Sequence, residues 1–273
     1  MHFQIIKPRP ALAPYIQHYW VLETTLMDGI VKERVVPTGD IELMFHYRKP
    51  FYVLDASGAS TFQPRSIITG LTSSWSDVIT GGESGAFVVT FYPGAAANFF
   101  NFPLLELEDK SVHLNDILHN EAICIEEQIA EATSLQARIN IIENFLMKRV
   151  SPIAPHDSNL INQGVMCISK HKGQISALAL SEQLCVTPKT LERKFARLVG
   201  KTPKQFIKII RFQEVMKSLS GVQPGLLTQH ALSNGYFDQA HFIKDFKTYS
   251  GYTPKELISQ KQCPDLIPEP GKF

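Results

Sequence analysis

The first hundred residues show a hydrophobic pattern with a period of two, which is typical of β-strands. In the clearest run, one face of the predicted strand carries Ile41, Leu43, Phe45 and Tyr47, and the other carries Glu42, Met44 and His46. Similar short runs lie at 51–54, 66–68 and 86–92, and turns rich in Gly and Ser separate them. Many short strands divided by turns predict a small β-sandwich or β-barrel.

After Pro93 the hydrophobic spacing changes to three and four residues, which predicts helices. Between 121 and 149 the apolar positions are Ile125, Ile129, Leu135, Ile139, Ile142 and Leu146. This stripe fits a dimerisation helix or an intramolecular bundle, and the sequence does not decide between them. The Pro-rich segment 151–158 marks a domain boundary. Residues 159–259 are predicted to form short helices, and 262–273 a loose tail.

The rear half of the chain contains an internal repeat with an offset of 51 residues. Residues 191–204 align with 242–255 through the pairs Phe195/Phe246, Gly200/Gly251, Thr202/Thr253, Pro203/Pro254 and Lys204/Lys255. A repeat of this kind implies two copies of one supersecondary unit.

Each copy has the pattern of a helix-turn-helix unit. In the first, a helix at 175–184 precedes Thr187-Pro188, an N-cap followed by proline at the first helical position. The helix that begins there buries Leu191, Phe195 and Leu198. The second copy has a helix at 226–233, a turn at 234–236 and a helix that buries Phe242, Phe246 and Tyr249.

The faces opposite these buried stripes combine cations, an amide and small residues. They carry Lys189, Arg193, Ala196 and Arg197 in the first copy, and Gln239, Ala240, Lys244 and Lys247 in the second. Such a face can enter a major groove, where Arg or Lys binds guanine and Gln binds adenine. A solvated helix face is the alternative for either helix alone; its repetition in a basic segment favours DNA.

Charge is divided unevenly along the 273 residues. The net charge of the whole chain is only +1. Residues 1–156 contain 11 basic and 17 acidic residues, a net of −6, whereas 157–261 contain 15 basic and 7 acidic residues, a net of +8. Residues 262–273 add −1. A basic segment of this size is expected of a protein that binds a phosphate backbone.

Sequence features that direct a protein to membranes or export are not evident. The N-terminus lacks the basic and apolar stretches of a signal peptide. The uncharged segment Ser84–Leu105 contains prolines and asparagines and its front half alternates like a strand, which argues against a membrane span. Four scattered cysteines, Cys124, Cys167, Cys185 and Cys263, are typical of reduced thiols, so a cytoplasmic location is expected.

On these motifs, residues 159–258 closely resemble the AraC/XylS family of bacterial transcription regulators. The resemblance rests on Gly200-Lys201-Thr202-Pro203 and Gly251-Tyr252-Thr253-Pro254, the stretch 234–239 and the spacing of the buried Phe residues. It implies an α-helical DNA-binding domain at 159–261, in which a long helix at 203–220 joins two helix-turn-helix units. Their recognition helices would enter successive major grooves.

The resemblance also implies roles for individual residues. Base-reading positions are Lys189, Arg193 and Arg197 in the first helix, and Gln239, Ala240 and Lys244 in the second. Phosphate contacts are expected from Thr187, Lys201, Lys204, Lys208 and Lys247. Ala240 offers no hydrogen bond, and Tyr236 stands where Phe is usual. Residues 187–217 have a net charge of +7 and 238–261 only +1, so the first unit is expected to dominate affinity.

The front half resembles the sensor part of some family members. Its marks are the segments 10–16, 36–43 and 93–100. The resemblance implies a cupin-like β domain at 1–110 and a helical connector or dimerisation region at 111–150, and therefore an α+β protein. Besides double-stranded DNA, the resemblance implies three further partners: a small-molecule effector, a second copy of the chain in a homodimer, and RNA polymerase. Effector-pocket candidates are Glu33, Asp40, Glu42 and His46, and solvated strand-face carboxylates are the alternative.

Signatures of catalysis and of cofactor or metal binding are absent from the sequence. His18 and His46 stand alone without the His-x-His of metal cupins, and there is no G-x-S-x-G or phosphate-binding loop. A regulator without enzymatic activity, cofactor or metal is therefore predicted. Two alternatives are a ligand-independent regulator with a dimerisation or partner-protein module in front, and a cupin-type metalloenzyme fused to a DNA-binding domain. The sequence leaves open the target genes, activation or repression, and the effector.

Overall fold

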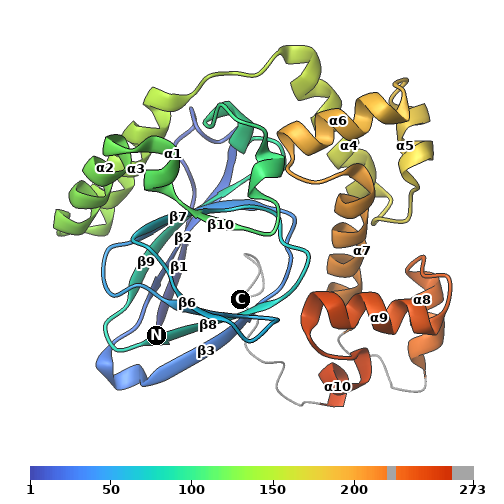
Figure 1. Ribbon diagram of the computed structural model, residues 1–273, viewed down its shortest axis with the longest axis horizontal. Helices are drawn as coiled ribbons and strands as arrows, with labels where there is room; N and C mark the ends of the chain where they lie inside the picture. The colour runs from blue at the N-terminus through green and yellow to red at the C-terminus, as the bar shows by residue number, and fades with distance from the viewer. Residues whose placement is uncertain (220–225, 260–273) are drawn as a thin grey trace.

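The computed structural model describes residues 1–219 and 226–259. The predicted tail, 262–273, lies outside the described residues, as does Cys263. A β-rich region occupies one side of the molecule, and helices lie above it and to its right in Figure 1. The predicted α+β class is confirmed.

The larger sheet has six antiparallel strands in the order β1-β2-β9-β4-β7-β10. Along the chain these are β1 (His2–Ile6), β2 (Ile16–Glu23), β4 (Ile41–His46), β7 (Ser66–Thr69), β9 (Gly85–Phe91) and β10 (Ser111–His113). The smaller sheet has the order β3-β8-β5-β6, built from β3 (Ile30–Val35), β5 (Tyr52–Asp55), β6 (Ser60–Phe62) and β8 (Ser76–Gly81).

The two faces of the larger sheet bury different partners. One face packs on helices and belongs to a large core that includes Ile41, Leu43 and Phe45. The other face contributes to a smaller core of Trp20, Leu22, Met44, Phe51, Ile67, Ala86 and Val88, against which Val78 of the smaller sheet packs. The side of β4 that carries Glu42, Met44 and His46 therefore faces the space between the sheets.

Helices of the connector cover the outer face of the larger sheet. They are α1 (Leu114–Leu118), α2 (Asn120–Glu131) and α3 (Leu135–Arg149). Of the predicted apolar stripe, Ile125, Ile129, Ile142 and Leu146 are buried within the chain, and Leu135 and Ile139 pack beside them. Intramolecular packing thus accounts for the stripe.

The rear half consists of seven described helices on one side of the β domain (Figure 1). They are α4 (Pro155–Lys170), α5 (Ala177–Gln183), α6 (Pro188–Leu198), α7 (Pro203–Leu219), α8 (Leu227–Ser233), α9 (Gln239–Ser250) and α10 (Pro254–Ser259). Among the described residues, no helix combines the length and the apolar content needed to cross a bilayer.

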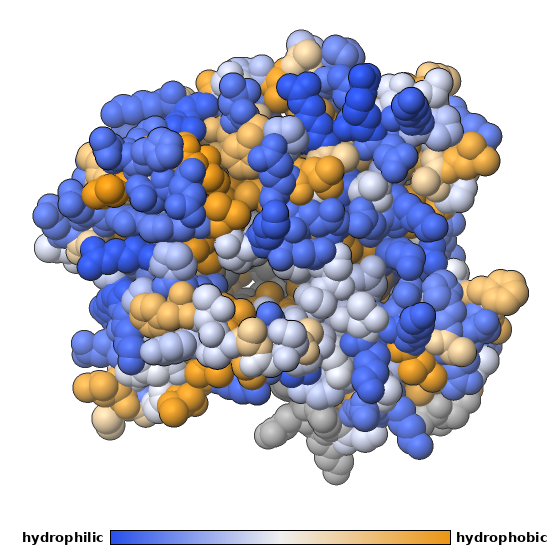
Figure 2. All heavy atoms as spheres, in the orientation of Figure 1, coloured by the Kyte–Doolittle hydropathy of each residue, from blue (hydrophilic) through white to orange (hydrophobic). Residues whose placement is uncertain are grey.

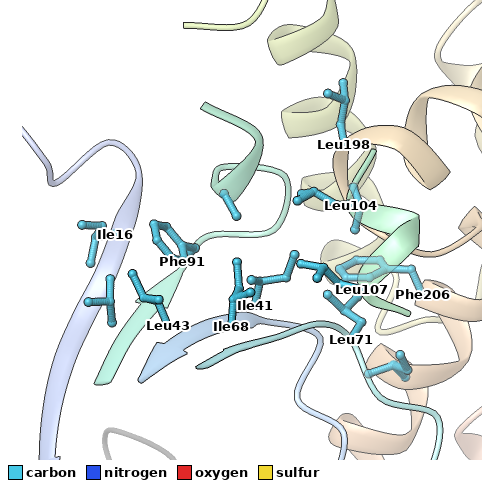
Figure 3. Close-up of a cluster of buried hydrophobic side chains, with 14 of the residues drawn as sticks. Ile16, Ile41, Leu43, Ile68, Leu71, Phe91, Leu104, Leu107, Leu198 and Phe206 are labelled. Atoms are coloured by element: carbon cyan, nitrogen blue, oxygen red, sulfur yellow. The ribbon is translucent and has the colours of Figure 1, made fainter. Parts of the chain in front are cut away.

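A continuous hydrophobic core joins the two halves. Figure 3 shows the side chains of Ile41 and Ile68 on the sheet continuing through Leu104 and Leu107 to Leu198 and Phe206 of the helical half. Residues 93–107, where the spacing predicts helices, form only the short 3₁₀ turns η2 (Ala96–Asn98) and η3 (Leu104–Leu107); a third, η1 (Leu26–Asp28), lies between β2 and β3. Pro103 interrupts helical hydrogen bonding, and Leu104 and Leu107 are buried at the junction of the halves instead.

Candidate nucleic-acid interface

The first helix-turn-helix unit consists of α5 and α6, and both helices begin with a side-chain cap. The hydroxyl of Ser176 accepts a hydrogen bond from the backbone N–H of Ala179 at 3.0 Å. The Thr187 hydroxyl accepts one from the N–H of Thr190, and Pro188 occupies the first turn of α6. Leu191, Phe195 and Leu198 are buried, as predicted.

The second unit consists of α8 and α9 and repeats these features. Asp238 caps α9 by accepting a hydrogen bond from the N–H of His241 at 2.7 Å. Gly251 ends the helix in the left-handed conformation, with φ of 78°. The buried residues are Phe242, Phe246 and Tyr249, together with Tyr236 ahead of the helix. The Tyr236 ring lies 5.1 Å from that of Phe242, so tyrosine fits this position.

Helix α7 connects the two units and packs against both. Phe206, near its start, lies 6.1 Å from the ring of Phe195 in α6, and Phe212 lies 5.5 Å from that of Phe246 in α9. In Figure 1, α7 stands between the units, with α6 near one end and α9 near the other. The two predicted recognition helices, α6 and α9, therefore both pack on one connecting helix.

The predicted base-reading residues lie on exposed helix faces. Lys189, Arg193 and Arg197 are exposed on α6, with half-buried Ala196 beside them. Gln239, Ala240 and Lys244 are exposed on α9, and Ala240, Lys244 and Lys247 border an open hollow along that helix. The side-chain oxygen of Gln239 accepts a hydrogen bond from Thr228 at 2.8 Å, which orients the amide at the start of α9.

The predicted phosphate ligands differ in accessibility. Thr187, Lys204 and Lys247 are exposed, and Lys208 is half-buried with its ammonium 3.5 Å from Asp245. Lys201 is completely buried, and its ammonium lies 2.9 Å from Glu108 Oε1 in the β domain. A phosphate group cannot reach it in this arrangement, so the structure corrects the role expected of Lys201.

Phe237 is a surface residue that the sequence patterns do not single out. Its side chain is 88% exposed directly before the cap of α9. The equivalent position in the first unit, Val186, is half-buried. The sequence contains one signal for this position: both copies have an apolar residue directly before the N-cap, and only the second copy has an aromatic one. The structure places this aromatic ring at the N-terminal end of the second recognition helix.

Comparison with known proteins agrees with this geometry. Residues 180–260 match a family described as a helix-turn-helix domain, and residues 4–113 match a domain of unknown function, DUF6597. A curated relative, XylDLEGF operon transcriptional activator 1 of Pseudomonas putida, is 26% identical over 100 residues, which are 36% of this chain and 30% of the relative. The chain thus spans less than a third of the length of the curated relatives it matches.

These matches support the resemblance of the chain to AraC/XylS-type transcription regulators. Two solved structures are similar to this chain. ToxT from Vibrio cholerae is 12% identical, covering 95% of this chain and 98% of that chain with a TM-score of 0.44. The C-terminal domain of AraT, a response regulator from Geobacillus stearothermophilus, is 23% identical, covering 45% and 96% with a TM-score of 0.35.

In the β domain, two of the predicted effector-pocket residues, Glu42 and His46, lie on the inner face of β4. The indole N–H of Trp20 donates to Glu42 Oε1 at 3.1 Å, and the Thr90 hydroxyl donates to the same oxygen at 3.2 Å. His46 Nε2 lies 3.1 Å from the side-chain oxygen of Gln63, and His46 Nδ1 is buried with no hydrogen-bond partner among the described residues. Polar groups of β2, β4 and β9 thus meet between the sheets.

The other two candidates lie apart from this group. Glu33 is buried on β3, directly opposite Val78, and therefore faces the same space from the smaller sheet. Asp40 precedes β4, where its carboxylate accepts a hydrogen bond from the Gln17 amide at 2.7 Å. Three of the four predicted residues therefore share the interior, and Asp40 lies at the end of the strand.

Burial changes the acid–base behaviour of the interior. Burial raises the pKa of Glu42, and the hydrogen bonds from Trp20 and Thr90 act in the opposite direction. Burial lowers the pKa of His46 to about 4, although its hydrogen bond with Gln63 acts in the opposite direction. His46 is therefore a neutral imidazole near pH 7.

Neither a group of metal ligands nor a pocket of aromatic side chains is assembled in the described part of the chain. Within 1–219 and 226–259, no three His, Cys, Asp or Glu side chains gather closely enough to bind one ion together. The four aromatic residues Trp20, Tyr47, Trp75 and Phe91 do not form one pocket. Trp20 belongs to the inner core, Tyr47 and Phe91 belong to the large core, and Trp75 contacts the second helix-turn-helix unit.

Proposed function

We propose that this protein is a cytoplasmic, sequence-specific DNA-binding regulator of transcription. The observation that supports this most is the pair of equivalent helices, α6 and α9, whose exposed faces carry base-reading side chains. Arg193 and Lys189 on α6 suit guanine, and Gln239 on α9 suits adenine. Lys244 and Arg197 extend these faces, and Ala240 allows close approach to a thymine methyl group.

Contacts to the DNA backbone would orient the helices. Thr187 and Lys204 flank α6, and Lys208 and Lys247 lie near the second unit, so that four side chains can reach phosphates on either side of the two grooves. Half-sites one helical turn apart, about 10 base pairs, follow from two recognition helices in successive major grooves of one duplex.

Selection of bound sequences from random double-stranded DNA tests this proposal. The full chain, incubated at moderate salt, should enrich a motif with two conserved blocks about 10 base pairs apart. A variant that removes both Arg193 and Lys244 should enrich none, while it keeps the fold of the parent by circular dichroism. Recovery of no motif with the full chain would remove the proposal.

We further propose that the β domain binds a small polar effector between its sheets. Two buried polar atoms, His46 Nδ1 and Thr80 Oγ1, have no hydrogen-bond partner in 1–219 and 226–259 and support this assignment, because such groups are costly unless something satisfies them. Figure 2 shows an opening on one face of the molecule, close to the position of β10 in Figure 1. Glu42 and Glu33 favour a ligand that donates hydrogen bonds.

A thermal-shift screen of the full chain against small polar metabolites tests the effector. A true effector should raise the melting temperature and change DNA affinity, and Glu42→Gln should abolish both effects. Glu83→Gln, in the turn between β8 and β9, is the matched control. If no compound stabilises the protein, the ligand-independent alternative, a dimerisation or partner-protein module, is supported instead.

Neither catalysis nor a cofactor is part of the proposed function. On the resemblance to the family, the proposal includes formation of a homodimer and contact with RNA polymerase. Sedimentation of the protein alone and with its selected DNA tests the dimer, and metal analysis of the purified protein tests the metalloenzyme alternative.

A further inference from the structure

The internal repeat has a structural consequence at its two G-x-T-P turns. Each turn follows a recognition helix, and Lys201 of the first is equivalent to Tyr252 of the second at the offset of 51 residues. Both turns rest on the β domain, although nothing in the repeat itself requires such contacts. The two contacts use different chemistry.

The first turn is held by a buried cation. Lys201 donates hydrogen bonds to Ser73 Oγ at 2.7 Å and Glu108 Oε1 at 2.9 Å, and Asp109 lies 3.4 Å away. Gln205, at the start of α7, donates to the same Glu108 oxygen at 2.7 Å. Because the lysine is completely buried, its charge depends on these acceptors.

The second turn is held by a cation from the β domain. The Arg34 guanidinium lies 3.7 Å from the ring centroid of Trp75 and 4.3 Å from that of Tyr252. It donates one hydrogen bond to the carbonyl of Ser250 at 3.2 Å and two to Asp77 at 2.7 and 3.0 Å. Gly251 lies so close that a Cβ there would be 2.7 Å from Trp75 Nε1.

One loop takes part in both contacts. Residues 70–75 connect β7 of the larger sheet to β8 of the smaller sheet. Ser73 of this loop contacts the first turn, and Trp75, two residues later, contacts the second. A third contact lies between them, where the side-chain amide of Gln213 in α7 donates to the carbonyl of Pro37.

These contacts leave the recognition faces uncovered. Arg193 and Lys189 of α6, and Gln239 and Lys244 of α9, stay exposed while the turns behind them are held. The contacts therefore position the two units without occluding them.

We propose that the β domain holds the two helix-turn-helix units in the relative position that two-groove DNA binding requires, through Arg34 at one turn and Glu108 at the other. This inference rests on the proposed function and assigns both residues as positioning residues. Preorganisation of this kind raises DNA affinity, because the second unit enters its groove without losing further conformational entropy.

Variants of the β domain test the inference without altering the DNA-binding half. The probes are DNA selected by the full chain and the same DNA with the α9 half-site scrambled. Arg34→Ala and Glu108→Ala should each weaken binding to the intact site by about tenfold. Binding to the scrambled site should stay within about twofold, because it engages only one unit. Lys32→Ala is the matched control, since Lys32 also pairs with Asp77, at 2.9 Å, and is not among the groups that hold the second turn.

Hydrogen exchange gives a readout that does not need DNA. Arg34→Ala should speed exchange in 239–259, whereas Lys32→Ala should not. Arg34→Lys, which keeps a charge beside Asp77, should show the same change if Arg34→Ala folds poorly. Exchange equal to that of the control would overturn the inference, as would unchanged or tighter binding to the intact site. Failure to select any DNA would count against the proposed function only, because the exchange result still decides whether the β domain holds the second unit.

Discussion

Arg193 carries the most specific chemistry on α6. A guanidinium can donate two hydrogen bonds to O6 and N7 of one guanine, which an ammonium cannot match geometrically. Its exposed side chain lies opposite the buried stripe of Leu191 and Phe195, so packing does not occupy it.

Arg193→Ala should therefore weaken binding to the preferred site by roughly 1–3 kcal/mol and relax base choice at one position. Titration against the preferred site and its single-base variants measures both effects. An equal loss on every sequence would instead assign Arg193 to a phosphate.

Lys204→Ala provides the contrasting case. Lys204 is exposed in the first turn of α7 and is expected to contact phosphate. Its loss should weaken all sequences alike and reduce the slope of log affinity against log salt by about 1. A sequence-dependent loss would contradict the phosphate role.

His46 should make stability depend on pH. Its pKa in the folded protein is lowered to about 4, below the ordinary value of 6.5, so the unfolded chain binds the proton more readily. The stability that comes from the neutral imidazole is complete above pH 6.5 and is lost as the pH falls toward 4. The loss should reach about 3 kcal/mol, because each tenfold decrease in proton affinity corresponds to about 1.4 kcal/mol.

Urea unfolding of the wild type between about pH 7 and pH 4.5, compared with His46→Gln, measures this effect. The variant should show a shallower pH dependence. His119→Gln, at an exposed position between α1 and α2, should retain the wild-type slope. Equal slopes in all three proteins would show that His46 titrates normally.

At the scale of elements, the recognition helices depend on their caps. Asp238→Ala removes the acceptor of the His241 N–H and should destabilise the second unit by about 1 kcal/mol. Asp238→Asn keeps an acceptor and should restore most of the loss. Hydrogen exchange of α9 reports the local effect. If the Asn variant is as unstable as the Ala variant, the charge of Asp238 and not its capping hydrogen bond stabilises the helix.

The local signals at α6 and α9 are sufficient to predict where both helices begin. Thr187-Pro188 and Asp238 satisfy or replace N–H groups within a few residues, so neighbouring sequence determines these helix starts. Strands β1 and β2 are not evident from the sequence, because their partners lie far along the chain: Phe3 pairs with Leu22, and Trp20 with Val88. The residues next to a strand in the sequence do not determine which distant strand it pairs with.

At the scale of the whole molecule, charge separation should control DNA binding. The +8 segment carries the lysines proposed to contact DNA, and the −6 segment lies beside it, joined in part through Lys201 and Glu108. If Lys204, Lys208 and Lys247 each neutralise one phosphate, affinity should fall with salt with a logarithmic slope of about −3.

Fluorescence anisotropy of the full chain on its selected DNA, at several salt concentrations, measures this slope. A slope near zero would show that base contacts alone hold the complex and would remove the phosphate assignments.

The sequence alone determined the internal repeat, the two recognition helices and the side chains on their exposed faces, because caps and helical spacing act within a few residues. It also placed Glu42 and His46 on one face of a strand. Only the tertiary structure decided that this face lies between two sheets, that Lys201 is buried against Glu108, and that Arg34 reaches Ser250. The last two contacts join residues about 90 or more positions apart, and no local pattern encodes which distant side chain will satisfy a buried charge.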